Sequence, residues 1–143
     1  MGYMVVPTNV RFAESTQRSL SRYVRASGHT KSSVINRAVD EWLRMQAHPR
    51  IRFVTVETGE RRAALLDGPQ VWTVAESWLA HRPAERTPEE VAHAVGISVA
   101  LVEAALAYWA EHRDEVDTVI DRHQAAQDEA LEAWERRRAL DAV

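Results

Sequence analysis

The sequence contains no cysteine, which excludes a disulfide-stapled scaffold and any zinc or redox site built on cysteine thiolates. Long hydrophobic runs are absent too, because no apolar run approaches the roughly 18 residues needed to span a bilayer. The N-terminal residues lack the basic start and the long apolar stretch of a signal peptide. We therefore expect a soluble cytoplasmic protein with no membrane partner.

Signatures of enzyme chemistry are also missing. The sequence has no glycine-rich phosphate loop and no nucleophile elbow. The histidines do not form a metal-spaced pair on one helix face with a carboxylate between them; they lie at positions 29, 48, 81, 93, 112 and 123. The sequence therefore predicts no catalytic residue, no metal site and no cofactor.

The composition that remains is globular, and its charge is uneven. The 143 residues are 45% hydrophobic and 27% charged, which argues against a wholly disordered chain. Residues 1–50 carry eight basic and three acidic side chains, whereas residues 111–143 carry five basic and ten acidic ones. A basic head and an acidic tail indicate different partners at the two ends, unless the asymmetry is chance variation on solvated faces.

A short strand is predicted over residues 6–12. One face of this strand would carry the apolar residues Val6, Val10 and Phe12, and the opposite face would carry Pro7, Asn9 and Arg11. No other strand candidate lies within the next 38 residues. Because a lone strand cannot satisfy its own backbone groups, we expect it to pair with the same strand of a second copy.

Two helices are predicted after this strand, over residues 14–27 and 31–47, with Gly28 ending the first and Thr30 capping the second. This is too little chain for a robust monomeric core, so a homodimer or higher oligomer is expected. The predicted dimer core consists of Val10, Phe12, Leu20, Val34, Ile35 and Val39. The paired strands would form a ribbon that fits the major groove of DNA and presents Asn9 and Arg11 to the bases.

The rest of the chain predicts a mainly α protein. A β-hairpin is expected over residues 51–66, helices over 70–81, 88–95 and 99–112, and one long amphipathic helix over 115–140. The predicted domains are residues 1–47, residues 50–112 with helix-turn-helix-like helices, and the C-terminal helix of residues 113–143. The helix after Ser98 has no basic residue before Arg113, so we expect it to pack a core and not to read DNA.

The segment TNVRFAESTQRSLSRYVRASGHTKSSVINRAVDEWL resembles the ribbon-helix-helix family of MetJ, Arc and CopG. The resemblance covers about a third of the chain. It implies that double-stranded operator DNA is the partner and that the start of the second helix binds a DNA phosphate. The residues at that helix start are Thr30, Lys31, Ser32 and Ser33. Pro7 departs from the pattern, because it cannot read a base through a hydrogen bond.

The segments HPRIRFVTVETGERRAALLDGPQVWTVAESWL and TPEEVAHAVGISVALVEAALAYW resemble a domain of antitoxins encoded beside PIN-domain ribonucleases, the VapBC type. This resemblance implies an autorepressing antitoxin whose C-terminal half neutralises a co-encoded PIN-type toxin. The candidate toxin-binding residues are Ile120, Leu131, Trp134, Arg136, Arg137 and Arg138. The alternatives are a stand-alone repressor with an accessory oligomerisation or sensing domain, and a protein-binding adaptor whose basic head does not contact DNA. For the apolar stripe the alternatives are packing on the second domain or dimerisation, and for the arginine cluster a favourable charge at a helix C-terminus.

Overall fold

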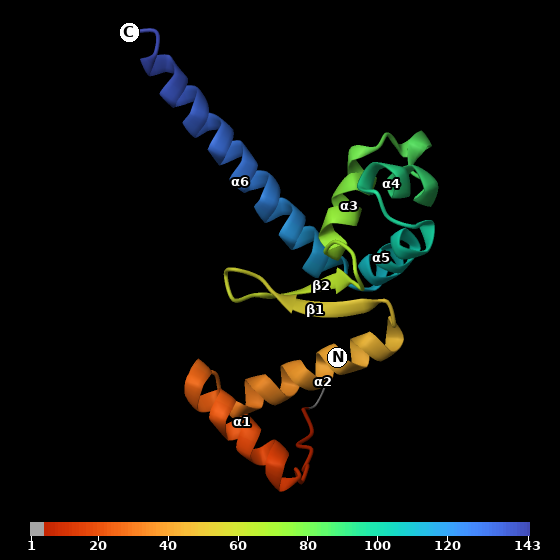
Figure 1. The fold of residues 1–143 in the computed structure, drawn as a ribbon, viewed down its shortest axis with the longest axis vertical. Helices are drawn as coiled ribbons and strands as arrows, with labels where there is room; N and C mark the ends of the chain where they lie inside the picture. Colours follow the sequence, from red (N-terminus) through yellow and green to blue (C-terminus); the bar gives the residue numbers. More distant parts are fainter. Residues whose placement is uncertain (1–4) are drawn as a thin grey trace. The chain divides into compact units, whose positions relative to one another are not determined.

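A computed structural model of the chain describes residues 5–143. Residues 1–4 lie outside the described residues. The predicted N-terminal domain and the segment that lacks signal-peptide features both begin with these four residues. The chain divides into two compact units, Met1–Leu43 and Arg44–Val143. The protein is mainly helical with one small antiparallel sheet, as predicted (Figure 1).

The first unit contains helix α1 (Glu14–Ser27) and the greater part of α2 (Lys31–Ala47). Both helices have the bounds that the sequence predicts. Helix α1 ends because Gly28 adopts a left-handed conformation, with φ of 75°, and donates its N–H to the carbonyl of Val24. A left-handed backbone costs free energy for any residue with a Cβ, and this explains why glycine occupies this turn.

The predicted N-terminal strand is absent from the single chain. Residues 5–13 belong to no helix or strand, and the first strand among the described residues is β1 (Ile51–Thr55). The physical reason is the one that the sequence suggests: a lone extended segment has no neighbouring strand to complete its hydrogen bonds. Strand formation over residues 6–12 and the ribbon-helix-helix arrangement therefore remain proposals about a dimer.

The second unit begins with a β-hairpin. Strand β1 pairs antiparallel with β2 (Arg61–Leu65), in a register that places Ile51 opposite Leu65. The turn is closed by a hydrogen bond from the Val56 N–H to the Glu60 carbonyl oxygen, at 2.9 Å. The predicted hairpin is therefore confirmed, with both strands slightly shorter than expected.

Four α-helices and a short 3-10 helix follow the hairpin: α3 (Val71–Ala80), η1 (Pro83–Glu85), α4 (Pro88–Val95), α5 (Val99–Glu111) and α6 (Arg113–Leu140). Two of the helix starts are capped by hydroxyls, as the sequence predicts. Thr87 accepts the N–H of Glu90, and Ser98 accepts the N–H of Leu101. The chain bends by 109° between α4 and α5, which is within the range of helix-turn-helix units.

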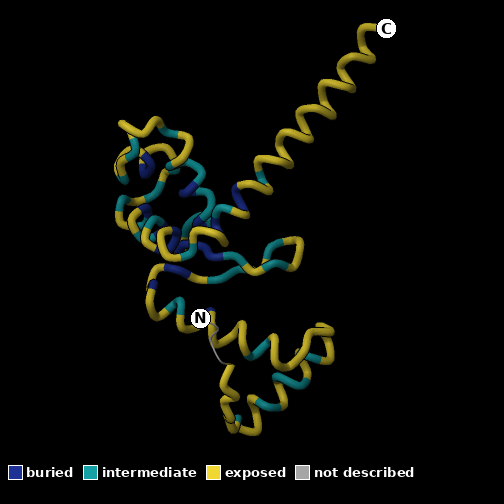
Figure 2. Tube along the Cα trace, turned by 180° about the vertical axis from the view of Figure 1, so that it is seen from behind, coloured by how far each residue is buried: buried dark blue, intermediate teal, exposed yellow. Residues whose placement is uncertain are grey.

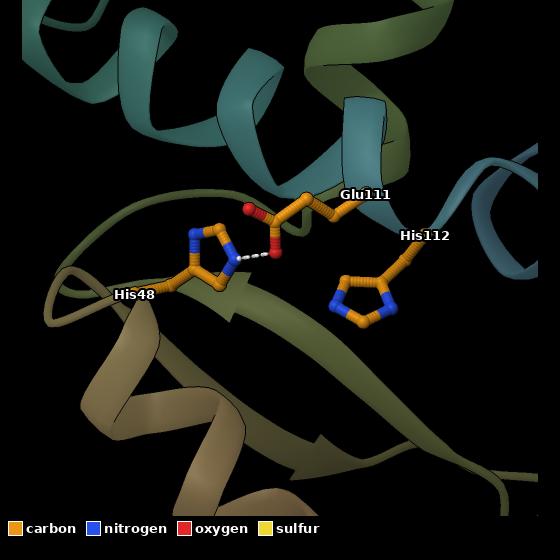
Figure 3. Close-up of side chains that lie close together, drawn as sticks. All are labelled: His48, Glu111 and His112. Carbon is orange, nitrogen blue, oxygen red and sulfur yellow. Dashed lines mark hydrogen bonds and ion pairs between the residues drawn. The ribbon is translucent and has the colours of Figure 1, made fainter.

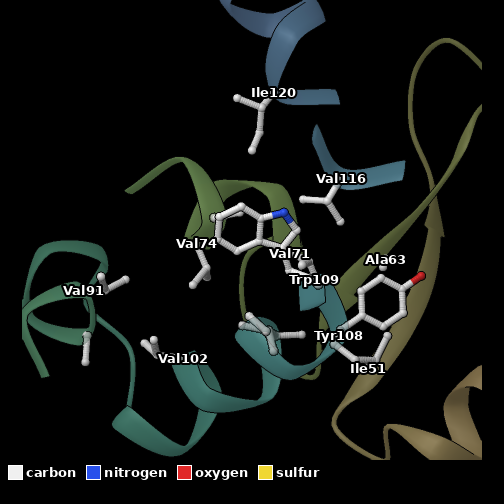
Figure 4. Packing of buried hydrophobic residues seen from close by; sticks show 14 residues of the cluster. Ile51, Ala63, Val71, Val74, Val91, Val102, Tyr108, Trp109, Val116 and Ile120 are labelled. Atoms are coloured by element: carbon white, nitrogen blue, oxygen red, sulfur yellow. The ribbon is translucent and has the colours of Figure 1, made fainter. Parts of the chain in front are cut away.

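The hydrophobic core lies in the second unit, where the hairpin, α3, α4, α5 and the start of α6 meet (Figure 4). Its buried members are Ile51, Ala63, Leu65, Val71, Val74, Ala75, Val91, Ala92, Val102, Ala105, Tyr108, Trp109, Val116 and Ile120. Among residues 5–143, no single helix combines the length and hydropathy needed to cross a membrane; α4 and α5 meet the criterion only as a bent pair.

Candidate functional site

The start of α2 has the features of an anion-binding helix terminus. Thr30 accepts the Ser33 N–H at 3.1 Å, and the Ser33 hydroxyl donates to the Thr30 carbonyl at 2.9 Å. These two bonds order the first turn of the helix. The N–H groups of Lys31 and Ser32 belong to the first turn, where an α-helix supplies no acceptor. Of the four predicted phosphate-binding residues, Lys31 and Ser32 therefore offer the accessible donors, and Thr30 and Ser33 hold their geometry.

The predicted base-reading residues lie in the extended segment before α1. Asn9 and Arg11 are both exposed. Val6 and Val10 of the same segment line an open hollow together with α2 residues that include Ile35. Pro7 and Thr8 also line this hollow, whereas Asn9 and Arg11 do not.

The predicted dimer core is not covered within one chain. Val10 and Val39 are exposed, and the other four members are half-buried: Phe12, Leu20, Val34 and Ile35. None of the described residues of α1 is buried. Over its described residues, 5–43, the first unit therefore presents an apolar surface and no hydrophobic core of its own.

The C-terminal helix is divided by burial. Ile120 is 3% exposed and belongs to the core, so the prediction that it contacts a partner is corrected: it is covered by the second unit itself. His123 is half-buried and packs against Trp72, with ring centroids 4.6 Å apart and the ring planes tilted by 47°. Every residue from 124 to 143 is exposed, as the yellow stretch in Figure 2 shows.

The remaining predicted partner-binding residues all lie on the exposed part of α6. Leu131 and Trp134 are each 53% exposed, although both are large and apolar. The guanidinium of Arg138 lies over the Trp134 ring, 4.9 Å from its centroid. Arg136 pairs weakly with Glu132 one turn earlier, at 3.9 Å, and Arg137 lies exposed in the last turn. The helix therefore presents two apolar side chains next to a cluster of cations.

Helix α5 packs the core instead of facing outward. Its buried residues are Val102, Ala105, Tyr108 and Trp109. The expectation that this helix packs a core is therefore confirmed.

A polar network centred on the buried Tyr108 lies where α5, α6 and the end of α2 meet. The hydroxyl of Tyr108 donates to Glu115 Oε2 at 2.6 Å and accepts from Arg44 Nη1 at 2.9 Å. Arg44 Nη1 also donates to Glu115 Oε1 at 2.9 Å. Burial raises the pKa of the Tyr108 hydroxyl well above its usual value, and the Glu115 hydrogen bond adds to this effect.

Beside this network, three potential metal ligands come together, although they are distant in the sequence. His48 Nε2 lies 2.8 Å from Glu111 Oε2, and His112 is the next residue after Glu111 (Figure 3). One ligand atom from each of the three side chains lies within 4.8 Å of the other two. Burial lowers the pKa of His112, and the positive charge of Arg44 lowers it further.

No protein-family model, curated protein or solved structure matches this chain. The case for a function therefore depends on the chemistry of the chain's own residues.

The histidine–glutamate cluster is the group that sequence reasoning missed. Spacing arguments look for ligands on one helix face, and His48 is separated from Glu111 by 63 positions. The adjacent pair Glu111–His112 at a predicted helix end is the one local signal. Nothing in the sequence pattern places His48 beside that pair, because the contact depends on how the hairpin returns the chain to α5.

Proposed function

We propose that residues 5–43 form a homodimeric ribbon-helix-helix unit that binds operator DNA. The supporting observation is that large apolar side chains of this unit are exposed in the single chain: Val5, Val6, Val10, Tyr23, Val39, Trp42 and Leu43. A unit of about 40 residues usually needs oligomerisation, a metal or disulfides to be stable, and a contiguous exposed apolar surface marks an interaction site. A second copy would cover the surface and would supply the missing partner strand.

The polar residues of the unit then fall where DNA contact requires them. In the paired ribbon Asn9 and Arg11 share the face opposite Val10, and their side chains suit adenine and guanine edges respectively. The backbone N–H groups of Lys31 and Ser32 would position the dimer by binding a phosphate. The excess of basic residues in positions 1–50 would favour approach to the duplex.

The test is fluorescence anisotropy with a duplex taken from upstream of the protein's own gene. Asn9→Ala and Arg11→Ala are each expected to weaken specific binding by about 1–3 kcal/mol, roughly 5- to 150-fold in Kd. Arg82→Ala is the matched control, because Arg82 is an exposed arginine of the second unit. Sedimentation equilibrium should find all variants dimeric. Unchanged operator affinity in both test variants would refute the base-reading assignment.

We further propose that the protein is the antitoxin of a type II pair and autorepresses its operon. Its C-terminal half would neutralise a co-encoded PIN-type ribonuclease. The exposed stretch of α6 supports this, because an amphipathic helix that leaves a tryptophan and a leucine in solvent suits the groove of a partner protein. The cationic cluster of Arg136, Arg137 and Arg138 would meet the carboxylates of such a nuclease site.

The test compares the full chain with a truncation after His123, which removes only exposed residues. Each is co-expressed with the product of the adjacent gene, and co-purification and ribonuclease activity are measured. Retention and inhibition by the full chain, and loss of both in the truncation and in Trp134→Ala, would support the antitoxin role. If the full chain binds operator DNA but neither retains nor inhibits the neighbouring product, the stand-alone repressor is the better description.

A further inference from the structure

Three side chains of the second unit converge from separate elements. His48 follows the last residue of α2, Glu111 is the last residue of α5, and His112 links α5 to α6 (Figure 3). The His48 imidazole is buried, and its Nε2 atom already lies 2.8 Å from a Glu111 carboxylate oxygen. A buried histidine aimed at a carboxylate, with a second imidazole beside them, is a combination that transition-metal sites use.

The distances are close to those of a coordinated ion. With bonds of about 2.0–2.2 Å, two ligands of a tetrahedral zinc ion lie roughly 3.3 Å apart. The three candidate ligand atoms lie within 4.8 Å of one another, so an adjustment of about 1.5 Å or less would be needed. The Glu111 side chain, which is 63% exposed, and the half-buried His112 have room to make this adjustment, whereas His48 is held in place.

We propose that His48, Glu111 and His112 form a binding site for a divalent transition-metal ion of the Zn²⁺ type. Two imidazoles and one carboxylate select zinc-like ions over Mg²⁺ or Ca²⁺, which prefer sets made of oxygen ligands. Three protein ligands leave a fourth tetrahedral position for water. The proposal concerns the second unit alone and does not depend on the proposed DNA or toxin binding.

The local charge balance permits a cation here. Arg44 brings a positive charge close to the cluster, because its Nη1 donates to the Tyr108 hydroxyl at 2.9 Å and the Tyr108 and His112 ring centroids are 4.4 Å apart. Its guanidinium is neutralised by the Glu115 carboxylate, with an N–O distance of 2.9 Å. Glu111 then supplies the negative charge at the proposed site itself.

A bound ion would connect two points that are far apart in the chain. It would link the residue directly after α2 to the junction of α5 and α6. Because an ion that binds the folded form adds to its stability, the second unit should resist unfolding better when it is loaded. The site would therefore act as a metal-dependent clamp on the segment that follows the second helix.

The experiment uses the untagged full-length protein, first treated with a chelator and then titrated. Co²⁺ is followed by its visible absorption and Zn²⁺ by calorimetry. We expect one ion per chain and a rise in the melting temperature with Zn²⁺. His112→Ala and Glu111→Gln should each raise the Kd at least tenfold. These two ligands are chosen because neither is buried, whereas replacing His48 could disturb the fold.

Matched controls separate this site from adventitious binding at other histidines. His93 lies exposed on α4 and Glu103 lies exposed on α5, so His93→Ala and Glu103→Gln should bind Co²⁺ and Zn²⁺ like the unaltered protein. Circular dichroism should find all four variants folded. The proposal is overturned if the protein binds neither ion, or if the test variants bind as tightly as the controls.

Discussion

Replacing Tyr108 with phenylalanine tests the polar network that joins α2, α5 and α6. Tyr108 is fully buried, so the ring of phenylalanine would keep its place in the core. The change removes one oxygen atom, which takes part in two hydrogen bonds. It donates to Glu115 at 2.6 Å and accepts from Arg44 at 2.9 Å.

The expected cost follows from the partners that remain. A hydrogen bond to a charged group contributes about 1.5–3 kcal/mol, so two such bonds set an upper limit of about 6 kcal/mol. Arg44 and Glu115 remain paired with each other, however, and their side chains are 24% and 46% exposed. Water can therefore replace part of what the hydroxyl supplied. We expect a loss of about 2 kcal/mol in the free energy of unfolding.

The assay is urea unfolding of the full protein at pH 7, followed by circular dichroism. With slopes of about 1–3 kcal/mol per molar urea, a loss of 2 kcal/mol lowers the midpoint by roughly 1 M. Thr118→Val is the control, because Thr118 is exposed on α6 in the same unit and loss of its hydroxyl should cost less than about 0.5 kcal/mol. A midpoint for Tyr108→Phe that equals that of the control would refute the reasoning.

The free energy of unfolding should depend on pH differently in the unaltered protein and in Tyr108→Phe. The pKa of Tyr108 is raised in the folded state, so the unfolded chain ionises first, near the ordinary value of 10.0. Above that pH the unfolded state binds fewer protons than the folded state, and stability falls as pH rises. Phenylalanine cannot ionise. The difference in unfolding free energy between the protein and Tyr108→Phe should therefore shrink as the pH rises above about 10.

Three further substitutions test local elements, each by the midpoint of urea unfolding. Gly28→Ala should cost about 1 kcal/mol, because alanine strains a backbone with φ of +75°; the added Cβ itself would meet no atom within 4 Å. Leu65→Ala should cost about 2–5 kcal/mol by opening a cavity in the core, whereas Leu79→Ala at an exposed position should cost much less. Thr87→Ala should cost about 0.5–2 kcal/mol, since its hydroxyl caps α4; equal midpoints for Thr87→Ala and Thr87→Ser would contradict this.

The helix bounds were predictable from the sequence because their signals are local. Gly28 ends α1 and Thr30 caps α2 through atoms within four residues of the helix end. Thr87 and Pro88 start α4 in the same way. Such bonds join residues that are neighbours in the chain, so the residues that make them can be identified from the sequence.

Features that depend on distant contacts were harder to predict. The apolar stripe of the last helix is visible in the sequence, but the sequence does not show which part the second unit covers, and Ile120 was therefore assigned to a partner surface. The meeting of His48 with Glu111 and His112 depends on the path of the hairpin. The N-terminal strand fails in a single chain for a related reason, because its partner would have to come from another molecule.

The exposed part of α6, which begins at residue 124, bears on the proposed binding of a partner protein. An isolated helix of about 20 residues is only marginally stable in water, and its local support here is limited to contacts such as the Arg138–Trp134 pair and the weak Glu132–Arg136 pair. It continues from the part of α6 that packs on the second unit through Ile120 and His123. In a fully solvated helix, the large apolar side chains of Leu131 and Trp134 gain nothing from burial. In a helix that docks in a groove, a few such side chains serve as anchors. If these two side chains are the anchors, partner binding should be lost in Trp134→Ala while the unfolding midpoint of the second unit stays the same, because Trp134 contributes nothing to the core.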